Sequence, residues 1–256
     1  MCGRYFLQRD PAQLARYYDT PEESPTPNAA ARWNMAPTQD GLVLRRNPET
    51  GERRLDLLRW GLVPRWAKDA RDGARLINAR ADGVAEKPSF RDAFRRRRCI
   101  VPADGFYEWL SPKEAEAKTK ARDPKQPFAV ALASGEPMSF AGLWEGWQDP
   151  EGNWLRTYSI ITTEANPKQA PLHHRMPVIL PREDWAAWLG EEEAPAARLL
   201  GLLRPCPPEW LACWPVSKRV NKVSEDDEAL IRRDAGVAAP PGLDDPSPYE
   251  RGSALG

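Results

Sequence analysis

The second residue of the chain, Cys2, has an unusual chemistry available to it if the initiator methionine is removed. A mature N-terminal cysteine carries an α-amine and a thiol on neighbouring carbons, with pKa values of about 7.7–8.0 and about 8.5. Both groups are partly nucleophilic near neutral pH. An aldehyde would form a Schiff base with the amine, and the thiol would then close a five-membered thiazolidine ring. On residue type alone, a second-position cysteine without chemical consequence is the simpler interpretation.

The only two histidines, His173 and His174, lie side by side in the run PLHHRMPVIL. Histidine is the side chain best suited to proton transfer near pH 7. Two imidazoles next to an arginine and ahead of an apolar run indicate a site at the entrance to a strand. A structural pair at the surface, or half-buried, explains the same residues equally well.

Three further polar residues lie in segments that suggest a site. Glu108 lies between aromatic residues in GFYEWL, and such surroundings can raise the pKa of a carboxyl so that it acts as an acid or base. The polar face of an alternating strand is the commoner outcome for such a residue. Asn78 and Arg80 lie in LINARAD, where an arginine suits phosphate binding and an asparagine can fix a polar group. A turn asparagine and a solvated arginine are the alternative.

Basic and aromatic residues offer two routes to nucleic acid. Residues 95–98 are four consecutive arginines, and such a run binds phosphates with salt-sensitive affinity. A solvated helix end is the plainer interpretation, because cations also suit a helix C-terminus. The eleven tryptophans could stack on unpaired bases, although most are expected in the core. Since the formal net charge is +0, a DNA-binding surface would require that charge be segregated.

Composition excludes several other classes of protein. The four cysteines form no CxxC pair, so a structural zinc site and a disulfide framework are both disfavoured, and a reducing compartment is expected. The N-terminus has no apolar signal region, and no run of about 18 apolar residues occurs that would span a membrane. We therefore expect no metal, no cofactor and no membrane partner.

The elements that must position these residues form a strand-rich α+β domain with peripheral helices. Asp10 followed by Pro11 is typical of a helix start, and Pro181 and Pro195 begin further predicted helices. The composition from 236 onward predicts a disordered tail over 236–256, after a single domain over 2–235. The predicted strands are 42–46, 53–60, 99–103, 128–132, 139–143, 158–162 and 176–180, and the predicted helices are 11–18, 89–98, 181–189, 195–203 and 225–232.

Ten separated blocks of sequence decide between these alternatives. They are MCGRY (1–5), WNMAPT (33–38), RWGLVPRWAKD (59–69), LINARAD (76–82), RRCIVPADGFYEW (97–109), KQPFAV (125–130), FAGLWEGW (140–147), ITTEAN (161–166), HHRMPVIL (173–180) and PVSKRVN (215–221). In content and order they resemble the SRAP family, the SOS-response-associated peptidases, which include abasic-site crosslinking proteins. The resemblance covers almost the whole chain, and it implies a β-rich, barrel-like α+β fold without a metal.

The resemblance also implies roles for four residues. Cys2 is similar to the family's crosslinking nucleophile, and Asn78 to the asparagine that positions the cysteine amine and the sugar. Glu108 is similar to the acid–base carboxylate for Schiff-base formation and reversal. His173 matches the histidine of the H-x-R-M-P motif, which would protonate the sugar ring oxygen, whereas His174 falls at the variable position and receives no role.

The implied partner is single-stranded DNA with abasic sites. The expected function is a covalent thiazolidine crosslink to the ring-opened sugar, with an autopeptidase (hydrolase) activity that removes Met1 and a possible lyase activity. Two alternatives are a non-covalent single-strand binding module and a thiol peptidase. We expect a cytoplasmic, nucleoid-associated bacterial monomer whose acidic residues lie away from the DNA. The DNA contacts that the resemblance implies are Arg4, Asn34, Pro37, Arg80, Trp109 and Arg175.

Overall fold

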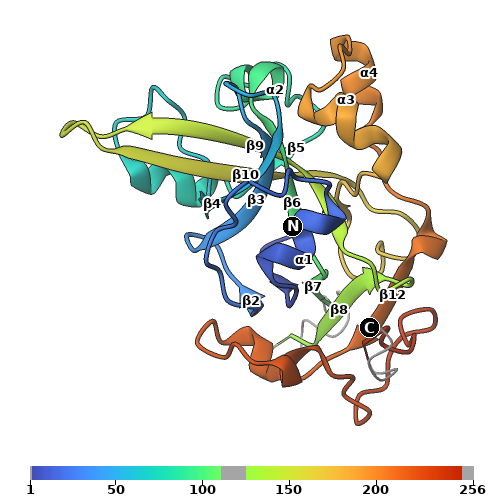
Figure 1. Cartoon of the computed structure of the whole chain (residues 1–256). Coiled ribbons are helices and arrows are strands. Elements are labelled where there is room, and N and C mark those ends of the chain that lie inside the picture. Colours follow the sequence, from blue (N-terminus) through green and yellow to red (C-terminus); the bar gives the residue numbers. More distant parts are fainter. Residues whose placement is uncertain (1, 111–124, 250–256) are drawn as a thin grey trace.

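The computed structural model describes residues 2–110 and 125–249, and a small closed barrel lies at its centre (Figure 1). Five strands pair in a ring, in the order β3, β4, β10, β9, β6 and back to β3. The closed ring confirms the barrel-like α+β fold expected from the sequence. Its strands are β3 (Asp40–Arg46), β4 (Arg53–Trp60), β6 (Arg98–Ala103), β9 (Met138–Gln148) and β10 (Trp154–Glu164).

Two short strands that carry predicted site residues pair with strand β10. β5 (Asn78–Arg80) runs parallel to it, with Arg80 opposite Thr162. β11 (Arg175–Pro177) runs antiparallel to it, with Pro177 opposite the same Thr162. A strand has only two edges, so β5 and β11 lie on opposite sides of β10. The LINARAD and HHRMP blocks, about a hundred residues apart, are thereby brought to one end of one strand.

A second, five-stranded sheet lies beside the barrel. Alternate residues of its strands face two different apolar clusters: Tyr5 and Phe106 join the main core with the barrel, whereas Phe6 and Tyr107 join a smaller cluster on the other face. Because both faces are buried, these strands are nearly continuous apolar runs. In spatial order the strands are β12 (Leu211–Pro215), β8 (Pro127–Leu132), β7 (Gly105–Trp109), β1 (Tyr5–Leu7) and β2 (Arg32–Met35).

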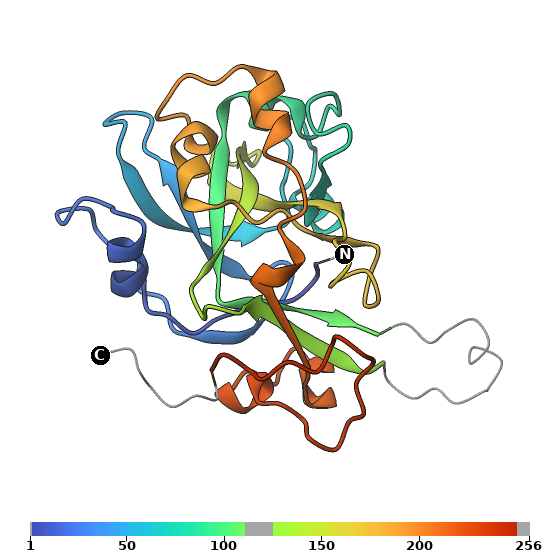
Figure 2. The same ribbon diagram turned by 90° about the vertical axis from the view of Figure 1, so that its right-hand side faces the viewer.

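The C-terminal segment covers the outer face of this sheet. Figure 2 shows it, in orange to red, running beneath the sheet. Two 3-10 turns, η4 (Lys218–Asn221) and η5 (Glu228–Ile231), supply Val220, Leu230 and Ile231 to the smaller cluster. The helix predicted over 225–232 is therefore only the single turn η5.

The tail predicted to be disordered from 236 onward is ordered as far as Tyr249. The Tyr249 hydroxyl donates to the carbonyl oxygen of Asp104 at 2.7 Å, Leu243 is buried, and Asp245 accepts from the backbone N–H of Cys213 at 2.8 Å. The average composition of the tail does not reveal these three contacts, because a few single side chains are enough to hold a polar segment on an apolar face. Residues 250–256 lie outside the described residues.

Helices lie at the periphery, as predicted, but they are shorter. The first begins where expected: Asp10 accepts from the backbone N–H of Gln13 at 2.8 Å, and the Gln13 side chain accepts from the backbone N–H of Asp10 at 3.1 Å. In the described residues, no helix is both long and apolar enough to span a membrane. The α-helices are α1 (Pro11–Tyr17), α2 (Arg91–Arg96), α3 (Trp185–Leu189, after the 3-10 turn η2, Arg182–Asp184) and α4 (Ala196–Gly201); the other 3-10 turns are η1 (Ala70–Arg75) and η3 (Pro208–Trp210).

Candidate active site

Cys2 is fully buried where the chain enters β1. The carbonyl oxygen of Arg4 accepts from the backbone N–H of Tyr107 at 2.9 Å, so the start of the chain runs along the end of β7. Burial, followed by the negative charge of Glu108, raises the pKa of the Cys2 thiol well above its usual range. The thiol is therefore protonated at neutral pH, and Cys2 and Glu108 lie close enough to interact electrostatically.

Glu108 is the ionisable group of β7 that faces the core. It lies two residues beyond Phe106 and so on the same face of the strand, where only 3% of it is exposed. Burial raises the pKa of its carboxyl from 4.5 to about 7. A carboxyl with this pKa is partly protonated at neutral pH and can both donate and accept a proton, as acid–base catalysis requires.

Asn78 contacts Cys2 directly. Its Nδ2 donates to the carbonyl oxygen of Cys2 at 2.8 Å, and its buried Oδ1 has no hydrogen-bond partner in the part of the chain that the structure describes. The peptide before Asn78 is held firmly, because the carbonyl oxygen of Ile77 accepts from Trp60 Nε1 at 2.9 Å and from the backbone N–H of Ile160 at 3.1 Å. The acceptor Oδ1 is thus presented next to Cys2 on a rigid strand.

His173 lies in the turn between β10 and β11. Its Nδ1 accepts from the backbone N–H of Arg175 at 3.0 Å, so the neutral ring carries its proton on Nε2. The pKa of His173 is lowered to about 4, mainly by burial and in smaller part by the neighbouring His174, whose ring stacks at 4.2 Å. His173 is therefore a neutral imidazole at pH 7, able to donate from Nε2. His174 is exposed, and the sequence assigned it no role.

Two of the predicted DNA contacts flank the Cys2 end of the sheet. The Arg4 guanidinium lies 5.9 Å from the centre of the Trp109 ring, and its Nη1 donates to the Asn34 side chain at 2.7 Å. Arg80 is exposed at the end of β5, where it forms an ion pair with Asp82 at 2.5 Å. Asp82 would therefore compete with a phosphate for the Arg80 guanidinium. The sequence analysis did not predict this ion pair.

Three further predicted DNA contacts, Asn34, Pro37 and Arg175, are buried or half-buried. Asn34 is fully buried, and Arg175 is 6% exposed with Nη2 donating to the carbonyl oxygen of Thr162 at 2.5 Å. Both side chains bond to protein carbonyl groups in this structure, and their contact with DNA stays a prediction. Pro37 is half-buried, next to Thr38 with its positive φ of 71°.

Sequence reasoning also missed an exposed aromatic ring and misplaced an acidic segment. Trp66 is 65% exposed, and an exposed indole is suited to stacking on an unpaired base. It lies in the block RWGLVPRWAKD, but sequence alone does not distinguish it from the other ten tryptophans, of which Trp154 is also exposed, at 59%. The acidic residues 225–228 do not lie away from the site, since Asp226 accepts from the backbone N–H of Asn34 at 2.9 Å. No group of three His, Cys, Asp or Glu side chains in residues 2–110 and 125–249 is placed to hold a metal ion.

Comparisons with known proteins give a consistent result. The family described as "SOS response associated peptidase (SRAP)" matches residues 1–223. The chain is 38% identical over 231 residues to the abasic site processing protein YoqW of Bacillus subtilis, covering 90% of this chain and 99% of that one. It is 32% identical over 268 residues to the abasic site processing protein HMCES of chicken, covering 93% of this chain and 79% of that one.

Solved structures support the fold. A protein from Bacteroides thetaiotaomicron has a TM-score of 0.78 at 24% identity, with 91% of this chain and all of that one covered. A protein from Bordetella bronchiseptica has a TM-score of 0.67 at 27% identity, with 84% of this chain and all of that one covered.

Proposed function

The chain belongs to the SOS response associated peptidase family, and on this premise we propose that it captures abasic sites in single-stranded DNA covalently through Cys2. Bacillus subtilis relatives that align over 96–99% of their length are named abasic site processing proteins, so DNA damage is the expected context. The observation that carries the proposal is the burial of Cys2 against Glu108 and Asn78.

The raised pKa of the thiol supports one order for the chemistry. Once Met1 is removed, the α-amine of Cys2 is the stronger nucleophile, because the thiol remains protonated. The amine nitrogen attacks the sugar aldehyde carbon, and the carbinolamine loses water to give an imine. The thiol sulfur then adds to the imine carbon while its proton passes to the nitrogen. One aldehyde, one amine and one thiol thus give a thiazolidine and one water.

Glu108 carries the protons of these steps. With a pKa of about 7, its carboxyl protonates the departing hydroxyl of the carbinolamine and, as a carboxylate, accepts the thiol proton. The unpartnered Oδ1 of Asn78 accepts from the amine or from a sugar hydroxyl and holds it in place.

His173 acts on the sugar as a neutral hydrogen-bond donor. The sequence resemblance implied protonation of the ring oxygen, which an imidazolium would perform most readily. A pKa of about 4 leaves too little imidazolium at pH 7, so Nε2–H stabilises the ring oxygen by hydrogen bonding as the ring opens.

The strand is bound by Arg80, by Arg4 with Trp109, and by stacking on Trp66. Arg80 and Trp66 are exposed, and Arg4 and Trp109 lie together beside Cys2. The buried Asn34 and Arg175 act behind this surface by holding the backbone that carries it.

Removal of Met1 by the same thiol is a second proposed activity, which the family's description as a peptidase favours. The Cys2 sulfur would attack the carbonyl carbon of residue 1, and the amide nitrogen would leave with the thiol proton delivered through Glu108. Water then hydrolyses the thioester, releasing methionine and restoring the thiol. Both activities therefore require the same pair of groups.

A denaturing gel tests the main proposal. Purified protein is mixed with a single-stranded oligonucleotide carrying one abasic site, beside Cys2→Ala, and intact mass establishes whether Met1 is absent. A denaturant-resistant band for the wild type alone supports covalent capture. No band with Met1 absent would refute it, leaving a non-covalent binding module or a peptidase.

A further inference from the structure

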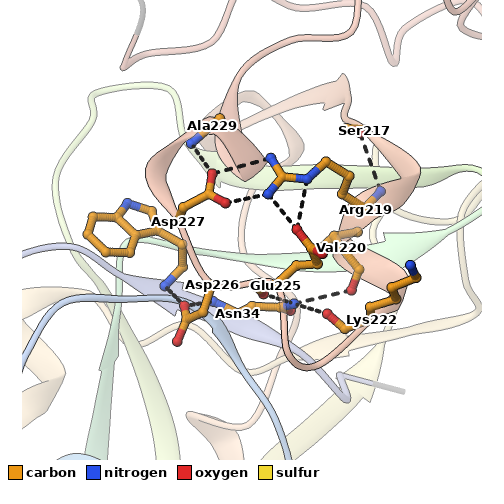
Figure 3. A network of polar contacts seen from close by, with 10 residues as sticks. Asn34, Ser217, Arg219, Val220, Lys222, Glu225, Asp226, Asp227 and Ala229 are labelled. Carbon is orange, nitrogen blue, oxygen red and sulfur yellow. Dashed lines mark hydrogen bonds and ion pairs between the residues drawn. The ribbon is translucent and has the colours of Figure 1, made fainter.

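The segment 217–227 lies across the end of the five-stranded sheet and is held there by the buried Asn34 (Figure 3). Asn34 Nδ2 lies within hydrogen-bonding distance of three carbonyl oxygens of this segment: Val220 at 3.3 Å, Lys222 at 2.9 Å and Glu225 at 2.6 Å. Arg4 Nη1 adds a bond to the carbonyl oxygen of Val220 at 2.8 Å. The path of the segment is therefore fixed from below by side chains of β2 and of the chain start.

The acidic residues of the segment are neutralised locally. Arg219 pairs with both Glu225 and Asp227 at 2.5 Å. Asp226 pairs with Arg32 at 2.5 Å and accepts from the backbone N–H of Trp33 at 2.6 Å. These carboxylates are already engaged with protein donors, which weakens the repulsion that they would exert on a phosphate.

The same segment also carries two lysines that take no part in these ion pairs. Lys218 and Lys222 are exposed, and neither forms an ion pair with any residue in 2–110 or 125–249. In Figure 3, Lys222 lies on the side of Asn34 away from Asp226 and Asp227. The carboxylates of this segment are thus paired with Arg219 and Arg32, whereas the two ammonium groups have no ion-pair partner in the part of the chain that the structure describes.

The two lysines lie next to the proposed active site. Between them, Asn221 Oδ1 accepts from Trp109 Nε1 at 2.6 Å, and Trp109 directly follows Glu108. The Nδ2 of Asn221 is buried without a hydrogen-bond partner among the described residues. The end of the sheet where Cys2 is buried therefore also presents two unpaired ammonium groups and an unused amide donor.

We propose that the segment 217–227 forms a wall of the DNA site, with Lys218 and Lys222 binding phosphates of the strand that flanks the abasic sugar. This inference rests on the proposed function for the identity of the ligand, but it assigns new residues to it. Asn34 is a positioning residue in this arrangement: it never contacts DNA, but it holds the three carbonyl groups that set the path of the lysine-bearing backbone.

The test measures binding of an intact single-stranded oligonucleotide, without an abasic site, at several salt concentrations. Each phosphate contact on a single strand contributes roughly 0.7 to the slope of log K against log salt, so Lys218→Ala with Lys222→Ala should reduce the slope by about 1.4. The control is Arg16→Ala with Arg204→Ala, which removes the same charge from exposed positions after β1 and before β12, at the other end of the sheet.

An unchanged slope in the lysine variant, or an equal change in the control, would overturn the proposal. Crosslinking of an abasic oligonucleotide in parallel separates the two claims. If the wild type forms the crosslink but the slope of the lysine variant is unchanged, only the 217–227 wall is refuted. If the slope of the lysine variant is reduced but the wild type forms no crosslink, the wall is supported and covalent capture is refuted. A wild type that binds no strand refutes both.

A second variant tests the role of Asn34. Asn34→Ala should speed hydrogen exchange at the backbone N–H groups of Val220, Lys222 and Glu225, and it should weaken binding of the intact oligonucleotide. Faster exchange with unchanged binding would remove Asn34 from the positioning role. If this variant does not fold, the lysine pair still decides the proposal.

Discussion

Replacing Glu108 with Gln should stabilise the protein at pH 8 while slowing its chemistry. The pKa of Glu108 is raised from 4.5 to about 7 because its carboxyl is buried. The unfolded chain releases this proton at lower pH than the folded chain, so stability is full below pH 4.5, falls as pH rises to 7 and is constant above. At about 1.36 kcal/mol per pKa unit, the loss is about 3 kcal/mol.

The assay is urea denaturation of the wild type and of Glu108→Gln at pH 5 and pH 8. At pH 5 the two proteins should differ by less than about 1 kcal/mol, because Glu108 is largely protonated in the folded wild type. At pH 8 the variant should be more stable by about 3 kcal/mol, which corresponds to roughly 5–10 °C in Tm for a domain of this size. His173, whose pKa is lowered, affects both proteins and cancels in the difference.

The control is Glu23→Gln, an exposed residue whose replacement should leave stability unchanged at both pH values. A gap between the wild type and Glu108→Gln that is the same at pH 5 and pH 8 would refute the raised pKa. Crosslinking by Glu108→Gln should be slower by about 10²-fold or more at pH 7, the usual contribution of a general acid–base group. A stable variant with wild-type rate would remove Glu108 from the chemistry.

Three further substitutions test the surroundings of Cys2. Asn78→Ala should slow crosslinking at least about tenfold with little change in binding of intact DNA, since it removes a positioning contact; equal losses in both assays would contradict this. Trp60→Phe replaces the buried indole by a smaller phenyl ring and loses the bond to the carbonyl oxygen of Ile77, so denaturation should show a loss of at least about 1–3 kcal/mol, with slower crosslinking because β5 is loosened. Asp82→Asn should release Arg80 and strengthen single-strand binding by up to about fivefold at low salt, since an exposed ion pair holds the arginine only weakly; weaker binding would show that Asp82 helps to orient the arginine.

The sequence predicted the strands of the barrel better than it predicted side-chain exposure. The strand pair over 42–46 and 53–60 is confirmed as β3 and β4, because its turn signal is local. β1 and β2 were not predicted, since three or four residues provide no period to detect. Their existence depends on pairing with β7 and with each other, which local sequence does not encode.

The candidate site shows the same limit. The resemblance implied that Asn34 and Arg175 contact DNA. Both are buried, and their partners are backbone carbonyl groups that have no sequence signature. Lys218 and Lys222 lie in or beside the block PVSKRVN, but only the ion pairs of Arg219 show that the lysines are the cations left over.

Because the chain is synthesised from its N-terminus, Cys2 and the residues that bury it leave the ribosome at different times. Its reactive end is synthesised first, but the groups around it come from residue 78, residue 108, the turn before β11 and the segment 217–227. At roughly 5–20 residues per second, the last of these leaves the ribosome about 10–45 s after the first. A ribosome-bound nascent chain therefore carries Cys2 for seconds without the side chains that surround it, and the complete candidate site forms only after residue 227 has left the ribosome.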